Sequence, residues 1–140
     1  MTSYDPYAHA EQLGIPVRPA VLPYGLGGLW LPEHRTIYLS HDLHPIRARC
    51  TCGHEVQHVI RGVKHTRGSR EWHRVIEAQC DRDAAALLIS VEDLADQVAG
   101  SADPGEWAAN LRVTGRMIRA RLRSLTPRER QLLDAIHFDP

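Results

Sequence analysis

The chain has 140 residues, with 17 basic and 17 acidic side chains and a formal net charge of zero. A chain of this length can bury one hydrophobic core of ordinary size, so we expect a single domain that spans residues 1–140. The balanced charge provides no long-range attraction to nucleic acid or to an anionic membrane surface. The longest apolar run, residues 84–91, is too short to span a membrane, and the N-terminal residues lack the pattern of a signal peptide. We therefore expect a cytoplasmic protein without a membrane anchor.

The N-terminal third predicts a short helix and three short strands. The helical pattern covers residues 7–13 and ends at Gly14. The extended segments, separated by turn-forming prolines and glycines, are residues 17–22, 28–31 and 35–39. We expect them to form an antiparallel meander that packs on the following helix. Residues 36–39 are the predicted edge at which an extended peptide would add as a further strand.

The next helical pattern, residues 45–61, carries the most informative motif of the chain. Pro45 suits the first helical position. Further along, His54, Glu55 and His58 form the pattern H-E-x-x-H. Positions four apart lie on one helix face, so both imidazoles can bind one metal ion. Glu55 can then act as general base on a water molecule at that metal.

A second helix, predicted over residues 69–90, supplies the carboxylates that this motif lacks. Glu77 and Asp81 lie one turn apart on the same face. We expect Glu77 to be the third metal ligand and Asp81 to accept a hydrogen bond from a ligating imidazole. Two imidazoles and one carboxylate leave a tetrahedral position open for water, which favours one catalytic Zn²⁺ per chain. A purely structural zinc site is less favoured, because such sites usually recruit a fourth protein ligand.

The sequence gives weaker evidence for a catalytic or metal-binding role of several other side chains. Tyr38, His65 and His73 are candidates to stabilise the transition state, although ordinary surface or packing roles explain them more simply. The three cysteines, at positions 50, 52 and 80, are an odd number and argue against a disulfide framework. We interpret them as buried or half-buried thiols, because C-x-C spacing is poor for a tetrahedral zinc site.

The C-terminal third suggests two alternatives. Residues 106–125 read like a helix-turn-helix, and residues 112–130 hold seven arginines and one acidic residue, Glu129. Four arginines of the second helix would suit contacts to DNA phosphates: Arg116, Arg119, Arg121 and Arg123. The same helix also carries an apolar set at helical spacing, which favours a core element instead: Met117, Ile118, Leu122 and Leu125. We prefer the core interpretation and expect no binding of nucleic acid. A last helix is predicted to begin at Thr126 with a capping box.

Several segments together resemble the ImmA/IrrE family of small bacterial and phage metallopeptidases: residues 13–17, 28–32, 36–39, 51–58 and 77–85. The last of these is similar to the family signature Glu-x-x-Ala-Asp-x-x-Ala-Ala, with Cys80 in place of the first alanine. The resemblance extends over about residues 10–125. It implies an α+β, minimal zincin-like fold, in which a short antiparallel sheet packs on the H-E-x-x-H helix and the C-terminal half is mostly helical. It also implies zinc on His54, His58 and Glu77, with Glu55 as general base.

The sequence therefore predicts a zinc-dependent endopeptidase. The resemblance implies that its substrate is a protein, a repressor-type transcription regulator with a helix-turn-helix. The alternative is a non-catalytic or DNA-contacting regulator that keeps the zincin fold and uses the arginine-rich C-terminal helix.

Overall fold

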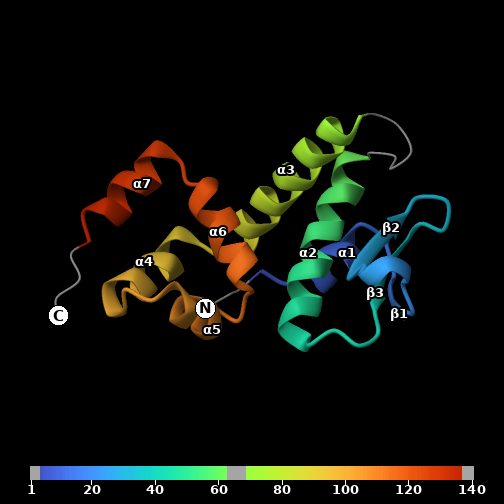
Figure 1. The fold of residues 1–140 in the computed structure, drawn as a ribbon, viewed down its shortest axis with the longest axis horizontal. Coiled ribbons are helices and arrows are strands. Elements are labelled where there is room, and N and C mark those ends of the chain that lie inside the picture. The colour runs from blue at the N-terminus through green and yellow to red at the C-terminus, as the bar shows by residue number, and fades with distance from the viewer. Residues whose placement is uncertain (1–3, 63–68, 137–140) are drawn as a thin grey trace.

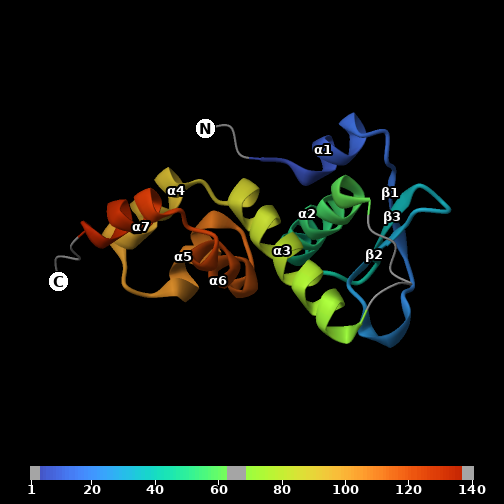
Figure 2. The same cartoon turned by 90° about the horizontal axis from the view of Figure 1, so that it is seen from above.

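The computed structural model describes residues 4–62 and 69–136. Within these residues, helices and a small three-stranded sheet make an α+β fold, which confirms the predicted fold class. The elements in chain order are α1 (Pro6–Gln12), β1 (Val17–Ala20), the 3₁₀ turn η1 (Pro23–Gly25), β2 (Gly28–Leu31), β3 (Thr36–Ser40), α2 (Pro45–Arg61), α3 (Arg70–Leu88), α4 (Val91–Gly100), α5 (Pro104–Leu111), α6 (Gly115–Arg123) and α7 (Pro127–Asp134). The sheet lies at one end of the molecule and α4 and α7 at the other, with α2 and α3 between them (Figures 1 and 2). No helix in the described part of the chain has the length and apolar character needed to cross a bilayer.

The sheet is mixed, so the predicted antiparallel meander is wrong. Its strand order is β1-β3-β2, with β3 parallel to β1 and antiparallel to β2. The turn over residues 32–35 joins β2 to β3 as a hairpin, whereas residues 21–27 form a longer connection that carries the chain past β3. Pro19 in β1 is consistent with an edge strand, because proline has no N–H to donate to a second neighbour.

The predicted peptide-docking edge, residues 36–39, is also wrong. These residues belong to β3, whose two sides are already paired with β1 and β2. Within the described ranges, β1 and β2 are the edges of this sheet. A substrate segment could therefore add to β2, which packs on α2, but not to β3.

Helix α2 is the central layer of this half of the molecule. Its middle turns are buried, because the sheet covers one side and α3 the other (Figure 1). Toward the sheet, Cys52 and Val56 share a cluster with Trp30, Ile37 and Leu39. Toward α3, a Cβ atom built on Gly53 would lie 3.4 Å from Leu88 Cδ1. This double cover explains how a helix with a polar motif comes to lie inside the protein.

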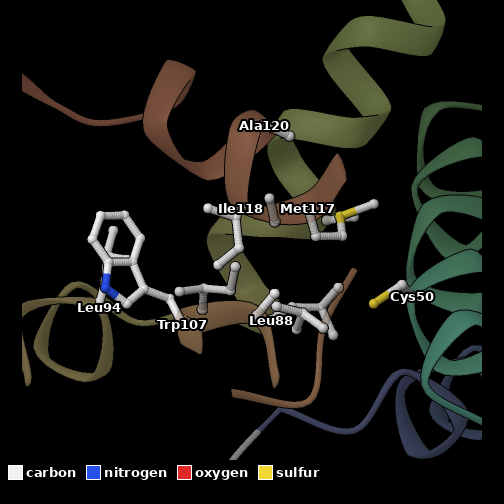
Figure 3. Close-up of a cluster of buried hydrophobic side chains, with 12 residues drawn as sticks. Cys50, Leu88, Leu94, Trp107, Met117, Ile118 and Ala120 are labelled. Atoms are coloured by element: carbon white, nitrogen blue, oxygen red, sulfur yellow. The ribbon is translucent and has the colours of Figure 1, made fainter. Parts of the chain in front are cut away.

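A second hydrophobic cluster connects α3 to the C-terminal helices. Figure 3 shows side chains of α3 to α6 meeting there, with Cys50 approaching from α2. Met117 and Ile118 of α6 are almost fully buried. Leu122 and Leu125 pack on the same cluster. The apolar face of α6 therefore belongs to the core, as its periodicity predicts.

Arg121 of the same helix is buried and forms interactions within the chain. Its Nη2 donates to Glu129 Oε2 at 2.9 Å, and its Nε donates to the backbone carbonyl of Ile89 at 2.6 Å. Glu129 also completes the predicted capping box with Thr126 at the start of α7. Arg121 thus joins α3, α6 and α7 and does not present its charge to solvent.

We predict that Glu129→Gln lowers the free energy of unfolding by about 1–3 kcal/mol, because it leaves a buried guanidinium without its carboxylate. Glutamine can still accept the capping hydrogen bond from the Thr126 N–H, so the change removes the negative charge without removing the capping box. The Arg121 guanidinium lowers the pKa of Glu129, so this stabilisation is present above the ordinary carboxyl pKa and is lost as pH falls through the lowered value. Urea unfolding of the wild type and the variant at several pH values measures this contribution to the free energy of unfolding. The control Asp134→Asn, on the exposed side of α7, should change stability by less than about 0.5 kcal/mol.

Candidate metal centre

Three side chains from two helices converge on one point. His54 and His58, one turn apart on α2, bring their Nε2 atoms to 3.2 Å from each other. Glu77 of α3 places Oε2 at 2.7 Å from His54 Nε2 and Oε1 at 2.8 Å from His58 Nε2. Within the described residues, these three form a group of donors that could hold a metal ion.

The local sequence explains this convergence. Helix α2 begins at Pro45, with His44 as N-cap, and ends where Gly62 adopts a left-handed conformation. Helix α3 begins after its N-cap, Ser69, whose side chain accepts a hydrogen bond from the N–H of Trp72. Both helices are long and lie side by side, so Glu77 in the middle of α3 meets the buried face of α2 (Figures 1 and 2).

The electrostatics of the group favour a cation. Although burial lowers the pKa of His54, its hydrogen bonds with Asp81 and Glu77 raise that pKa to about 10. For His58, burial again lowers the pKa, but interactions with Cys80 and Glu77 raise it to about 9. Burial raises the pKa of Glu77, yet the two imidazoles lower it well below its usual range. The pocket thus stabilises positive charge at the imidazoles, and a divalent cation would supply that charge in place of protons.

The donor set suits a transition metal of the zinc type. Donor atoms about 2.0–2.1 Å from a tetrahedral ion are roughly 3.3 Å apart, so the observed separations need to widen by about half an ångström or less. Two imidazoles and one carboxylate, with no fourth donor grouped with them among the described residues, match the composition of catalytic rather than structural zinc sites.

Asp81 orients His54 and is itself held by Arg116. Its Oδ1 accepts from His54 Nδ1 at 2.7 Å, the contact expected from the sequence. Its Oδ2 accepts from Arg116 Nε at 2.9 Å and from Arg116 Nη2 at 2.7 Å. Burial raises the pKa of Asp81, but His54 and Arg116 together lower it, so the carboxylate stays ionised. The link to Arg116 of α6 is not apparent from the sequence, because the two residues lie far apart in the chain.

Glu55 lines the same cavity as two of the donors, His54 and Glu77, and its carboxylate is buried. Within the described structure its Oε2 has no hydrogen-bond partner. Burial raises the pKa of Glu55, which makes this carboxylate a better proton acceptor than an exposed one. Gly28 of β2 allows the strand to come close, since a Cβ there would lie 2.6 Å from Thr51 Cγ2 and 3.1 Å from Glu55 Cγ. A larger residue at this position would displace Thr51, a requirement that periodicity alone does not reveal.

A cavity of about 300 Å³ opens over this group. Its walls come from the loop before β2, from α2 and α3, and from the start of α6, where Thr114, Arg116 and Met117 lie. The start of α6 therefore forms one side of the candidate site, and Arg47 of α2 reaches the same cavity.

The weaker candidates fall outside this cavity or outside the described residues. Tyr38 lies on β3 between Ile37 and Leu39, which face α2, so its side chain is on the opposite face, where it bonds to His34 at 2.9 Å. His73, at the start of α3, makes an edge contact with Trp72 and does not line the cavity. His65 lies outside the described residues.

The cysteines are buried free thiols, as predicted. Cys80 lies beside His58 and raises the pKa of its imidazole, although it is not one of the three grouped donors. Burial raises the pKa of Cys52 to about 12 and also raises that of Cys50. Both thiols are therefore protonated at neutral pH and do not favour metal binding.

An H-E-x-x-H helix whose two histidines share a carboxylate from the next helix is typical of metallopeptidases. The comparison with protein families agrees: the model of the IrrE N-terminal-like domain, Peptidase_M78, matches residues 10–123. The chain belongs to this family, which confirms the resemblance recognised in its sequence. No curated protein matches the chain.

We predict that protein purified without chelator carries about one equivalent of metal per chain and that His58→Ala largely loses it, because two donors hold a divalent ion far less tightly than three. Elemental analysis with a panel of metals measures both the amount and the identity. The control His41→Ala removes an exposed histidine and should keep the metal. Metal-free wild type, or full retention in His58→Ala, would contradict the assignment.

We predict a smaller effect for Asp81→Ala. This change leaves all three donors but removes the acceptor that orients His54, so metal affinity should fall roughly 10–100-fold. Competition with a chromophoric chelator measures the affinity. Unchanged affinity would show that the Asp81–His54 contact does not support the site.

Proposed function

We propose that the protein is a zinc-dependent endopeptidase that binds one zinc ion through His54, His58 and Glu77. The observation that carries the proposal is the position of Glu55. A buried carboxylate oxygen that has no partner among the described residues lies in the same cavity as His54 and Glu77, two of the three grouped donors. Family membership supports a peptide bond as the target.

The residues divide the chemistry between them. A zinc ion held by the three donors would acidify a water molecule and polarise the carbonyl of the bond to be cleaved. Glu55 takes a proton from the attacking water as the new C–O bond forms. It then delivers that proton to the amine nitrogen as the C–N bond breaks. Asp81 holds the His54 ring in place, and Arg116 keeps Asp81 ionised.

The free edge of β2 is the surface on which an extended substrate would lie. Among the residues that the structure describes, β2 has a hydrogen-bonded neighbour on one side only. Gly28 brings this strand against Glu55, and Gly27 and Gly28 line the cavity. A peptide that adds to this edge as a strand would pass its backbone carbonyls in front of Glu55.

The substrate class follows from the family resemblance. We propose a repressor-type transcription regulator with a helix-turn-helix as the substrate, which the enzyme would meet in the cytoplasm. The DNA-contacting alternative has less support, because several arginines of the C-terminal helices are engaged within the chain. Arg116 binds Asp81, Arg121 binds Glu129, and Arg130 donates to the carbonyl of Leu122.

We predict that co-expression with helix-turn-helix repressors encoded near its gene yields specific cleavage of one of them, and that Glu55→Gln abolishes this cleavage. Glutamine keeps the shape of the side chain but cannot accept the proton, and it removes no metal donor. Immunoblots of the tagged repressors follow cleavage, and metal analysis of the variant shows that the site is intact. The control Glu92→Gln, on the exposed face of α4, should cleave like wild type. Cleavage at the wild-type rate by metal-loaded Glu55→Gln would refute the mechanism.

A further inference from the structure

A second cavity, of about 260 Å³, adjoins the metal centre and is lined mainly by arginines. Arg82 comes from α3, and Arg116, Arg119 and Arg123 come from one face of α6. We call these four residues the arginine pocket. Among the described residues, Asp81 is the single acidic residue in its wall, so four guanidinium groups share the space with one carboxylate.

Most of this positive charge is not balanced within the described part of the chain. Asp81 already accepts from His54 and Arg116. The ion pairs among the described residues include none with Arg82, Arg119 or Arg123. Gathering like charges in a concave surface raises the free energy of the folded chain unless an anion binds there. Because the protein as a whole is neutral, this local excess is a property of the pocket.

The arginine pocket shares a wall with the candidate metal centre. Asp81 and Arg116 line both cavities. A polypeptide bound across the metal centre could therefore place a side chain in the arginine pocket without leaving the surface. A carboxylate side chain is the natural occupant, since guanidinium forks bind carboxylates in a bidentate manner.

We propose that the arginine pocket binds a carboxylate side chain of the substrate and thereby selects peptides with an acidic residue close to the cleaved bond. This inference rests on the proposed function, because the metal centre defines where the peptide lies. It assigns Arg119 and Arg123 a role in substrate selection that neither the metal site nor the core requires. Both side chains are exposed, so substitutions there leave the hydrophobic face of α6 intact.

The shape of the pocket favours a peptide over DNA. A duplex presents phosphates along a convex surface and is best met by cations spread over an exposed face or stripe. Here the free arginines line a hollow beside the metal centre, while Arg121 and Arg130 of the same region make contacts within the chain. The pocket therefore fits an inserted side chain better than a nucleic acid backbone.

Binding to two short fluorescein-labelled peptides tests the proposal. One peptide alternates alanine with glutamate and the other alternates alanine with glutamine, so a carboxylate can reach the pocket in any register. Fluorescence anisotropy is measured with metal-loaded, full-length Glu55→Gln, which should bind a peptide without cutting it. We expect the glutamate peptide to bind roughly tenfold or more tightly than the glutamine peptide. Adding Arg119→Gln and Arg123→Gln should abolish this preference.

The matched control carries Arg74→Gln and Arg128→Gln, which remove the same charge from exposed positions outside the pocket. It should keep the preference. Equal binding of the two peptides, or equal loss in both double variants, would overturn the proposal. Duplex DNA of random sequence is measured in parallel. Salt-sensitive duplex binding that needs Arg119 and Arg123, without a preference for the acidic peptide, would assign the pocket to nucleic acid instead.

These results remain distinct from a failure of the proposed function. Peptide binding does not require hydrolysis. A protein that shows the glutamate preference, but whose wild type cleaves nothing, would refute the endopeptidase and keep the pocket as an acidic-peptide site. If the wild type and the Arg119→Gln, Arg123→Gln variant cleave a repressor equally well, the endopeptidase proposal stands and the pocket proposal is refuted.

Discussion

The structure depends on the burial of a polar helix face between a sheet and a second helix. Two imidazoles and a carboxylate on α2 lie almost out of contact with solvent. Burying such groups is costly unless each finds a partner of suitable charge. The partners come from α3: Glu77 bridges the two histidines and Asp81 holds His54. A bound cation would complete this compensation, and its binding would then be thermodynamically linked to the folding of the α2–α3 pair.

The C-terminal helices extend this network beyond the metal. Arg116 of α6 binds Asp81, which in turn binds His54, so a cation in the wall of the cavity supports a candidate metal donor through a shared carboxylate. The position of Arg116 depends on the burial of its neighbour Met117 in the cluster that joins α3 to α6 (Figure 3). Stability of the C-terminal half and the geometry of the metal centre are therefore connected through one helix.

The arginines of α6 lie in different environments and have different roles. Arg121 is a buried structural cation, Arg116 supports the metal site, and Arg119 and Arg123 line a pocket. On the sequence alone they form a single basic cluster of the kind that contacts phosphate. The helix separates them, because successive residues are turned by about 100° and meet different neighbours.

The side chains of the candidate metal centre could be predicted from sequence periodicity. Helical periodicity places His54 and His58 on one face, and the spacing of Glu77 and Asp81 does the same on α3, so the donors and the orienting carboxylate follow from local geometry. The boundaries of α2 are also local, because Pro45 and Gly62 set them through their backbone preferences. Periodicity likewise identified α6 as a core helix.

Only the tertiary structure decided which strands pair and which distant residues meet. Short strands of similar composition do not encode their order, and the crossing of residues 21–27 past β3 made the sheet mixed and moved the free edge to β2. The contact of Arg116 with Asp81 and the closeness of Gly28 to Glu55 join segments far apart in the chain. Such contacts arise from the packing of whole elements, and no local preference of either residue specifies them.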